Sequence, residues 1–448
     1  MIHTFLSHSK VILLLAFPVI IENILQVLLG TTDTYFAGKL APEAIAAIGS
    51  VNLVMNIFIA FITAISVGAS AIIARYIGLK ELKKAKVSMQ QAIILACSIG
   101  LVLGLLSFIV AKPLLLLLGT ETNVLKYAIP YFYTVGIPCV FLSLMMILSS
   151  TLRSMGDTKT PMIAAVVANL LNMILNYVLI FGLFNIPALG IVGAGLATTL
   201  SRIVAVSILI FKLYHGNRII KFQLRDRWIL DKKVFLSILG IGMPAGIEKL
   251  IMRAGQMVYG SVILSLGTSA YVAHNIAGTI ESYSYLPAMG FGIAAATLVG
   301  QSLGAKNVQL AKQYGLVANI LSTIVMILIG LFFFTTAPIL ASLFTNDMEI
   351  QSLVVNVLRI IALFQPFLSI TNVIASALQG AGDTKFPMYA TLMGVWGIRV
   401  VFGYLFAVIF NLGLVGIWLA YSLDILLRGL LLMYRFLRGK WYTTIMLE

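Results

Sequence analysis

Two carboxylates in the first apolar segment are the residues of this sequence best suited to do chemistry. Residues 11–37 form a long apolar run that nevertheless contains Glu22 and Asp33, with Gln26 between them. In a helix, eleven residues make about three turns, so the two carboxylates share a face roughly 16 Å apart, with Gln26 on the same stripe. Because a charge in hydrocarbon is costly, each carboxylate is a functional candidate. Pro18 precedes them and can kink or loosen the helix.

Three uncharged polar residues are predicted to lie at the depth of Asp33. Asn172 and Asn176 are four residues apart in the apolar run 160–184, and Thr198 lies in the next run. If these segments meet, they form an oxygen-rich site with a single carboxylate, which suits a proton or a hard cation such as Na⁺. The structural alternative is that Asn and Thr only hydrogen-bond neighbouring membrane helices together.

The second half of the chain carries a different set of charges. Glu248 and Arg253 follow Pro244, and Arg399 lies in the apolar run 387–411, where it needs a charged partner or water. An ion pair between Glu248 and Arg253 is one interpretation, and contact with a substrate in a cavity is the other. The residues considered for a substrate cavity are Gln26, Glu22, Glu248, Arg253 and Met252.

The chain lacks the sequence patterns of common catalytic sites. It has no Gly-Lys-Ser/Thr motif that would cradle phosphates, which excludes ATP hydrolysis by a P-loop. Its four His and two Cys residues have no metal-ligand spacing, and no Ser/His/Asp arrangement can be argued. The sequence therefore predicts no enzyme, no cofactor and no metal site beyond the Na⁺ alternative at Asp33. Energy for transport would have to come from an ion gradient.

The elements that must position these residues are membrane helices. Of the 448 residues, 60% are hydrophobic and 10% charged, and the mean hydropathy is +1.05, so lipid is the solvent for most of the chain. Each apolar run can cross about 30 Å of hydrocarbon as a helix of roughly 20 residues, whereas a β-barrel would show short alternating strands. We predict an all-α polytopic membrane protein with twelve transmembrane helices. Their approximate spans are 11–37, 45–75, 89–111, 125–150, 160–184, 190–214, 234–262, 270–300, 316–340, 350–378, 387–411 and 413–437.

The distribution of basic residues predicts the orientation. The loops after the second, fourth, sixth, eighth and tenth predicted helices are rich in Lys and Arg, and the opposite loops carry few. By the positive-inside rule, both termini are cytoplasmic and the protein lies in the inner (cytoplasmic) membrane of the cell. The net charge of +15 has the same explanation and requires no nucleic-acid partner.

The two halves of the chain repeat at a constant offset, which is the separation between Pro18 and Pro244. At this repeat offset the segment 151–162, which contains Gly-Asp-Thr-Lys, matches the segment 377–388. Glu22 likewise falls on Glu248, and Gly78 on Gly304. Six helices per half, an even number, predict parallel repeats related by a pseudo-two-fold axis along the membrane normal, as in several secondary transporters. The predicted parts are an N-terminal six-helix lobe (1–214), a basic cytoplasmic linker (215–233) and a C-terminal six-helix lobe (234–448).

These residues resemble the multidrug and toxic compound extrusion (MATE) transporters over essentially the whole chain. The resemblance is carried by residues 18–38 with Thr-Asp-Thr at 32–34, by the paired Gly-Asp-Thr-Lys-x-Pro-Met loops, and by residues 171–172 and 190–198. It implies two six-helix lobes, a V-shaped central cleft, and export of drug-like, often cationic compounds in exchange for H⁺ or Na⁺. Within the family the chain looks closest to the bacterial DinF-like branch.

The resemblance also implies roles for individual residues. The helix 1 aspartate of the DinF-like branch, matched here by Asp33, is the expected protonation site, and helix 1 is thought to bend near the proline matched by Pro18. The helix 5 asparagine matches Asn172, and the helix 6 threonine matches Thr198.

Two departures from the family pattern bear on the coupling ion. Some relatives have an aspartate where this chain has Asn176, so the predicted site holds one carboxylate fewer. The C-lobe carboxylates of the NorM-like branch fall on Met252 and Leu368 here, and Glu248 is one turn too early. A C-lobe Na⁺ site of that type is therefore not expected, which favours proton coupling through Asp33.

We therefore expect a secondary active multidrug exporter in which protonation of Asp33 drives helix 1 bending and substrate release. Its partners would be small drug-like molecules, H⁺ or Na⁺, and the lipid bilayer, and a monomer would suffice. The alternative is a flippase for a lipid-linked precursor from the same superfamily, with Lys249, Arg253 and Arg399 giving its cavity positive charge. Twelve helices and the MATE-like motifs weigh against it. A membrane-embedded enzyme or a passive channel is a third class, against which the missing catalytic residues and the repeat argue.

Overall fold

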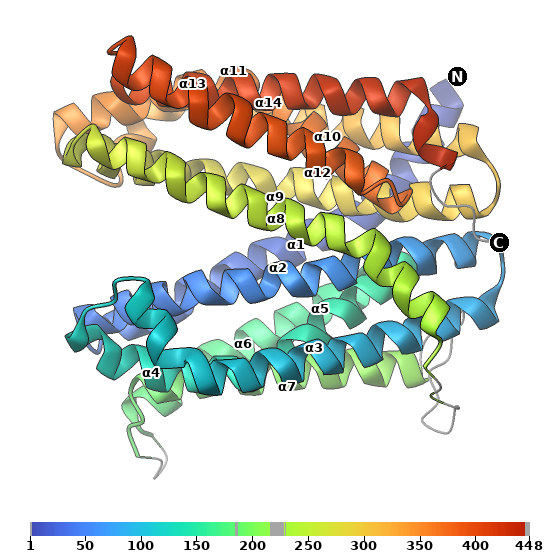
Figure 1. The fold of residues 1–448 in the computed structure, drawn as a ribbon, viewed down its shortest axis with the longest axis horizontal. Coiled ribbons are helices and arrows are strands. Elements are labelled where there is room, and N and C mark those ends of the chain that lie inside the picture. The colour runs from blue at the N-terminus through green and yellow to red at the C-terminus, as the bar shows by residue number, and fades with distance from the viewer. Residues whose placement is uncertain (1, 184–186, 216–227, 229, 444–448) are drawn as a thin grey trace. The chain divides into compact units, whose positions relative to one another are not determined.

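The protein is described by a computed structural model that covers residues 2–183, 187–215, 228 and 230–443 (Figure 1). Throughout these residues the regular elements are helices, and no strand occurs among them. This confirms the predicted all-α class. Helices are the expected outcome for such apolar sequences, because a helix satisfies its backbone N–H and C=O groups within one membrane-crossing segment.

The described helices follow the predicted spans along the chain. Those of the first half are α1 (Ile2–Gly38), α2 (Pro42–Gly78), α3 (Leu82–Leu117), α4 (Thr122–Gly136), α5 (Cys139–Ser154), α6 (Lys159–Phe181) and α7 (Ile191–His215). The second half begins with α8 (Lys232–Ser265), α9 (Thr268–Gly304), α10 (Val308–Ser342) and α11 (Met348–Gly380). It ends with α12 (Lys385–Leu392), the π-helical η1 (Met393–Val400), α13 (Val401–Tyr404), the π-helical η2 (Leu405–Ile409), α14 (Gly413–Arg438) and the short 3₁₀ helix η3 (Lys440–Thr443).

Among the described residues, eleven spans are long and apolar enough to cross a membrane, and the number is twelve if α4 and α5 form one bent span. The predicted span 125–150 is this bent pair, with an angle of 49° between its two helices. Pro138 stands between them as the N-cap of α5. Because proline has no backbone N–H to donate, the helix is interrupted there.

The predicted repeat is also present in the backbone. Lys80 follows α2 with a φ of 61°, and Lys306 follows α9 with a φ of 57°. Positive φ is uncommon for a residue other than glycine. Lys80 and Lys306 are equivalent at the repeat offset, so the two halves use the same turn.

Contacts within the chain divide it into two compact units. The N-unit is Ile21–Gly246, and the C-unit comprises Met1–Ile20 and Ile247–Glu448. The two boundaries, after Ile20 and after Gly246, are equivalent at the repeat offset and lie two residues after Pro18 and Pro244. Helices α1 and α8 therefore each belong to both units. The predicted division into 1–214, 215–233 and 234–448 instead follows the sequence repeat and stays a prediction, and most of its linker lies outside the described residues.

Glycine lets the early part of each shared helix pack closely. In the N-unit, a β-carbon on Gly242 of α8 would clash with the carbonyl oxygen of Ala64 in α2. In the C-unit, a β-carbon on Gly290 of α9 would meet Ile20 and the carbonyl oxygen of Ala16 in α1. The pair of Ala16 and Gly290 is equivalent to the pair of Gly242 and Ala64 at the repeat offset. The first helix of each half therefore packs in the same way on the second helix of the other half.

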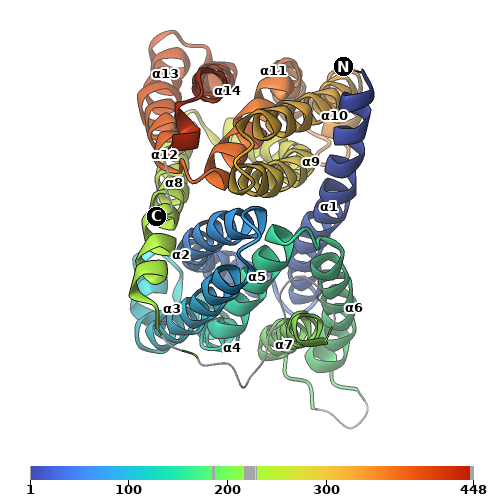
Figure 2. The same ribbon diagram turned by 90° about the vertical axis from the view of Figure 1, so that its right-hand side faces the viewer.

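Two groups of neighbouring helices carry most of the buried polar residues. In the N-unit, α6 packs along α7 (Figure 2), and α7 also contacts α4 and α5. In the C-unit, α11 packs against α9, α10 and α14, and α14 contacts the π-helical segments. Polar residues on α6 and α7 are thus brought together in one unit, and polar residues on η1 and α14 in the other.

Candidate functional site

A buried polar cluster in the N-unit joins α1, α6 and α7. Asp33 accepts a hydrogen bond from Asn176 Nδ2 at Oδ1 (2.7 Å) and one from Thr198 Oγ1 at Oδ2 (2.8 Å). Asn176 also donates to Asn172 Oδ1 (3.0 Å), and Asn172 Nδ2 donates to Thr198 Oγ1 (3.2 Å). The most exposed of the four side chains is Asp33, at 3%. The structure thus brings together the four residues predicted for ion coupling.

The hydrogen-bond directions in this cluster suit an ionised Asp33. Both of its oxygens accept, and the Asn176 amide uses both of its N–H donors. Thr198 has one O–H but two acceptors in reach, Asp33 Oδ2 at 2.8 Å and the Ala194 carbonyl oxygen at 3.1 Å. A proton added to Oδ2 can be donated to Thr198, whose own O–H then turns to Ala194. The cluster can therefore take up one proton without leaving a buried donor unpaired.

Two further residues adjoin the cluster and were missed by the sequence analysis. Arg202 lies one turn after Thr198 on α7 and interacts electrostatically with Asp33. Its Nη1 is buried and has no hydrogen-bond partner among the described residues. Tyr131 of α4 is buried within electrostatic range of Asp33 and Arg202. Arg202 could have been found from the sequence, because it is an arginine in an apolar run and shares a helix face with Thr198. No sequence pattern points to Tyr131.

The cluster offers oxygen ligands rather than nitrogen or sulfur. Asn176 Oδ1 is buried and has no hydrogen-bond partner among the described residues. With the Asp33 carboxylate, Asn172 Oδ1 and Thr198 Oγ1, it forms a hard donor set with one negative charge. Among the described residues, no group of three or more His, Cys, Asp or Glu side chains is placed to hold a metal ion. This donor set fits a proton or a monovalent hard cation.

Glu22 belongs to a separate ion pair in the same unit. Arg153 of α5 donates through Nη1 to both Glu22 oxygens, at 2.8 and 2.9 Å. Glu22 is buried, whereas Gln26 is exposed and does not share the burial of the two carboxylates. The polar stripe predicted for α1 is therefore divided, because Glu22 pairs with α5 and Asp33 with α6 and α7. Pro18 is buried inside the continuous helix α1.

Glu248 occupies the equivalent position in the C-unit. It accepts hydrogen bonds from Gln379 Nε2 and Thr391 Oγ1, both at 3.0 Å. Gln379 is the repeat equivalent of Arg153, so the contact between Arg153 and Glu22 recurs in the C-unit with a neutral donor. Glu22 and Glu248 therefore both bridge the first and fourth membrane-spanning segments of their halves.

The ion pair considered between Glu248 and Arg253 is not formed between these two described residues. Arg253 is exposed and donates through Nη1 to Gln256 Oε1 at 3.1 Å. The reason is helix geometry, because residues five apart do not share a face, whereas residues three or four apart do. Met252 is partly buried on the same helix. The structure does not bring Met252 and Arg253 into the Glu248 contact.

A second buried charged cluster lies in the C-unit. Arg399 of η1 donates to Asp424 Oδ2 of α14 through Nε (2.9 Å) and Nη2 (2.6 Å), and Arg428 Nη2 donates to the same oxygen (3.1 Å). Glu281 of α9 accepts from the Tyr421 hydroxyl at 2.7 Å. The charged partner that Arg399 was predicted to need is Asp424, which the sequence analysis did not name.

This second cluster could have been predicted from the sequence repeat. At the repeat offset, Asp424 falls on Thr198 and Arg428 on Arg202. In each half, the last helix thus presents a polar residue followed one turn later by an arginine. The N-unit places its carboxylate on α1, and the C-unit places its carboxylate on α14 itself.

Comparisons with known proteins agree with this fold. The MatE family model matches residues 18–178 and 244–405. "Probable multidrug resistance protein NorM" of Thermotoga maritima is 33% identical over 439 residues, which cover 96% of this chain and 93% of that protein. "Uncharacterized transporter YisQ" of Bacillus subtilis is 28% identical, with 95% of this chain and 93% of that protein covered.

Solved structures of transporters have the same fold. A MOP superfamily transporter from Pyrococcus furiosus superposes with a TM-score of 0.90 at 24% identity, covering 96% of this chain and 95% of that one. A crystal structure of MATE in the bent conformation gives the same TM-score, identity and coverage. With a family match in both halves and a relative that shares a third of its residues along nearly its full length, this multi-span membrane protein belongs to the MatE family, the MATE transporters, and is not an enzyme.

Proposed function

We propose that this protein is a secondary active exporter of drug-like, often cationic and amphipathic compounds, driven by inward movement of H⁺ through Asp33. The substrate class is supported by the Thermotoga maritima relative, whose name describes a multidrug resistance protein. The coupling ion is supported by one observation. Asp33 is buried in a network that can take up one proton by turning the Thr198 hydroxyl toward Ala194.

Proton uptake changes the bonding of α1 to its neighbours. With Asp33 ionised, two charge-assisted hydrogen bonds hold α1 to α6 and α7. Once Asp33 is neutral, these bonds weaken, because hydrogen bonds to ionised groups are about twice as strong as neutral ones. A proton that enters from the outside thus loosens the outer part of α1, and its release toward the cytoplasm restores the bonds.

The bend of α1 is placed near Pro18. Proline removes one backbone hydrogen bond from the helix and weakens it locally. The segment of α1 that belongs to the N-unit begins at Ile21, directly after this weak point. Loosening at Asp33 would then let residues 21–38 change their packing while residues before Pro18 keep theirs, and the altered packing would lower substrate affinity.

Orientation and assembly complete the proposal. The basic loops put both termini on the cytoplasmic side of a bacterial inner membrane, and a monomer suffices for the exchange. We place the chain in the DinF-like branch, because its N-unit holds the aspartate and its C-unit has Met252 and Leu368 at the NorM-type positions.

The test is ethidium efflux from liposomes that contain the purified protein. A pH gradient and a Na⁺ gradient are imposed separately, and the wild type is compared with Asp33→Asn. The matched control is Glu43→Gln, which neutralises an exposed carboxylate in the first turn of α2. We expect efflux driven by the pH gradient, its loss in Asp33→Asn, and wild-type rates in the control.

Other outcomes separate the alternatives. Efflux driven by Na⁺ alone would assign the ion to the oxygen ligands around Asp33, including the unpartnered Asn176 Oδ1. Full pH-driven efflux by Asp33→Asn would contradict coupling through this residue. No ethidium efflux under either gradient, together with scrambling of a fluorescent lipid-linked precursor, would favour the flippase.

A further inference from the structure

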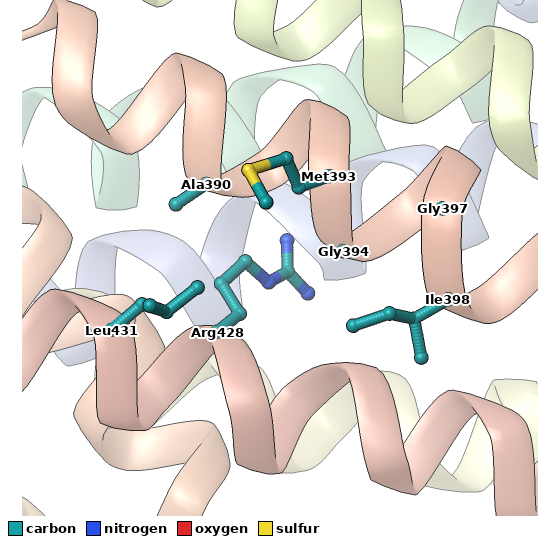
Figure 3. A pocket seen from close by; sticks show the side chains of 7 residues that line it. All are labelled: Ala390, Met393, Gly394, Gly397, Ile398, Arg428 and Leu431. Carbon is teal, nitrogen blue, oxygen red and sulfur yellow. The ribbon is translucent and has the colours of Figure 1, made fainter.

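A cavity of about 280 Å³ opens in the C-unit between the α12–η1 segment and α14 (Figure 3). Gly394 and Gly397 lie on the η1 side of the cavity. Met393, which also lines it, is 62% exposed, so the cavity reaches the surface of the protein. Among the described residues that line it, Arg428 carries the one charged side chain. The apolar side chains of its wall belong to Ala390, Met393, Ile398 and Leu431.

Arg428 is poorly paired for a buried cation. Its side chain extends from α14 toward Met393 and Gly394 (Figure 3). The residue is buried, with an exposed fraction of 6%. It donates through Nη2 to Asp424 Oδ2 at 3.1 Å, and Nε is buried without a partner among the described residues. A buried guanidinium is stabilised when its N–H groups are paired, and Nε lacks such a partner among the described residues.

Arg428 shares its carboxylate partner with a second arginine. The Asp424 oxygen that it contacts already accepts two N–H groups of Arg399, at 2.9 and 2.6 Å. The next carboxylate, Glu281, accepts a hydrogen bond from the Tyr421 hydroxyl. The centroid of the Tyr421 ring lies 4.2 Å from the guanidinium carbon of Arg399. Arg399 thus has Asp424 and the Tyr421–Glu281 pair beside it. Arg428 therefore shares one carboxylate oxygen with Arg399, and its Nε keeps a free N–H among the described residues that can bind a further acceptor.

The depth of the cavity limits what can reach it. Arg428 lies ten residues before the end of α14 at Arg438, which is about 15 Å along a helix. That is about half of the hydrocarbon thickness of a bilayer. A phospholipid phosphate stays near the interface, and a small inorganic anion would lose its hydration to a single guanidinium and apolar walls.

We propose that this cavity binds a lipophilic monocarboxylic acid, with its carboxylate on Arg428 and its apolar body against the wall residues Ala390, Met393, Ile398 and Leu431. A guanidinium edge matches the two oxygens of a carboxylate. A monocarboxylate brings one negative charge to this cluster, whereas a phosphate dianion would bury two. Such an acid partitions into the bilayer and gives its proton to water at the interface, so that its carboxylate form can bind the arginine. This site is separate from the Asp33 cluster and does not depend on proton coupling there.

The test is photolabelling of the full chain in phosphatidylcholine nanodiscs with a decanoic acid that carries a terminal alkyl diazirine. Two variants act on the site by different routes. Gly397→Leu fills the cavity, since a β-carbon at Gly397 has no atom within 4 Å. Arg428→Gln removes the charge. Their controls are Gly240→Leu, an exposed open glycine of α8, and Arg438→Gln, an exposed arginine of α14.

We expect labelled peptides that contain residues 390–398 or Leu431, with decanoate competing and decanol or acetate not competing. Labelling should fall about tenfold or more in Gly397→Leu and Arg428→Gln, because each removes either the space or a charge-assisted bond. Both controls should label like the wild type. Equal competition by decanol, or unchanged labelling in Gly397→Leu, would overturn the proposal. If Arg428→Gln fails to fold, the cavity-filling variant decides alone.

Discussion

At the scale of single residues, the hydroxyl of Thr198 is the group that lets Asp33 change its charge inside the N-unit. It donates to Asp33 Oδ2 and has a second acceptor in the Ala194 carbonyl. We predict that Thr198→Val, which keeps the shape but removes the hydroxyl, lowers pH-driven efflux about tenfold or more, since a hydrogen bond to a charged group is worth about 1.5–3 kcal/mol. Thr198→Ser should retain most of the rate. Initial efflux rates in liposomes measure this, and wild-type rates in Thr198→Val would show that the hydroxyl plays no part.

The Glu22–Arg153 pair allows the repeat itself to be tested. Arg153→Gln should destabilise the protein by about 3 kcal/mol, because it removes the cation beside a buried carboxylate. The C-unit holds the equivalent Glu248 with two neutral donors, Gln379 and Thr391. The position equivalent to Thr391 is Ala165, so Ala165→Thr added to Arg153→Gln should recover part of the loss. Thermal unfolding of the single and double variants measures this, with Ala165→Thr alone as the control. A double variant no more stable than Arg153→Gln would mean that the second donor does not reach Glu22.

At the scale of elements, the π-helical segment η1 brings backbone against the charged cluster of the C-unit. A π-helix is rare and is associated with functional positions. A β-carbon on Gly394 would collide with Asp424 Oδ1, whereas a β-carbon on Gly397 meets nothing within 4 Å. We predict that Gly394→Ala displaces Asp424 from Arg399 and destabilises the protein by about 2–4 kcal/mol. Gly397→Ala should be neutral or stabilising by up to about 1 kcal/mol. Equal thermal unfolding midpoints for the two variants would contradict this role of Gly394.

The same scale shows which elements the sequence could predict. Apolar length and the constant repeat offset predict the spans and the repeated turns, because hydropathy and turn geometry are local properties. The break at Pro138 could not be singled out, since Pro18, Pro113 and Pro244 lie inside continuous helices. Neighbouring helices compensate for some missing hydrogen bonds and not for others, and that depends on tertiary packing.

The polar sites follow the same division between local and tertiary information. Asn172 and Asn176 could be grouped with Asp33 because i,i+4 spacing and depth in the membrane follow from helix geometry. The position of Tyr131 depends on how α4 packs against α7, which no spacing records. Asp424 could have been predicted from the sequence repeat. The ion pair considered between Glu248 and Arg253 rested on their closeness in sequence, although residues five apart in a helix do not share a face.

At the scale of the whole molecule, the two boundaries between the units fall at equivalent places. Each lies two residues after a proline within the first helix of a half, at Ile20 and Gly246. Each unit therefore includes the start of one of these helices and the remainder of the other. A change of helix direction at Pro18 or Pro244 would alter how the two units are connected, so both prolines are expected to act as hinges.

We predict that Pro18→Ala and Pro244→Ala each lower pH-driven efflux about tenfold while raising thermal stability. Alanine restores the N–H that bonds to the carbonyl four residues earlier, and proline inside a helix costs about 3 kcal/mol. The control is Pro113→Ala in α3, since Pro113 also lies inside a continuous helix, and α3 belongs wholly to the N-unit. It should raise stability in the same way without slowing efflux. If Pro18→Ala alone slows transport, the hinge is confined to α1, and the equivalence of the two halves is limited to their packing. If Pro113→Ala slows transport as much as the other two, helix stiffness in general rather than the boundary position limits the rate.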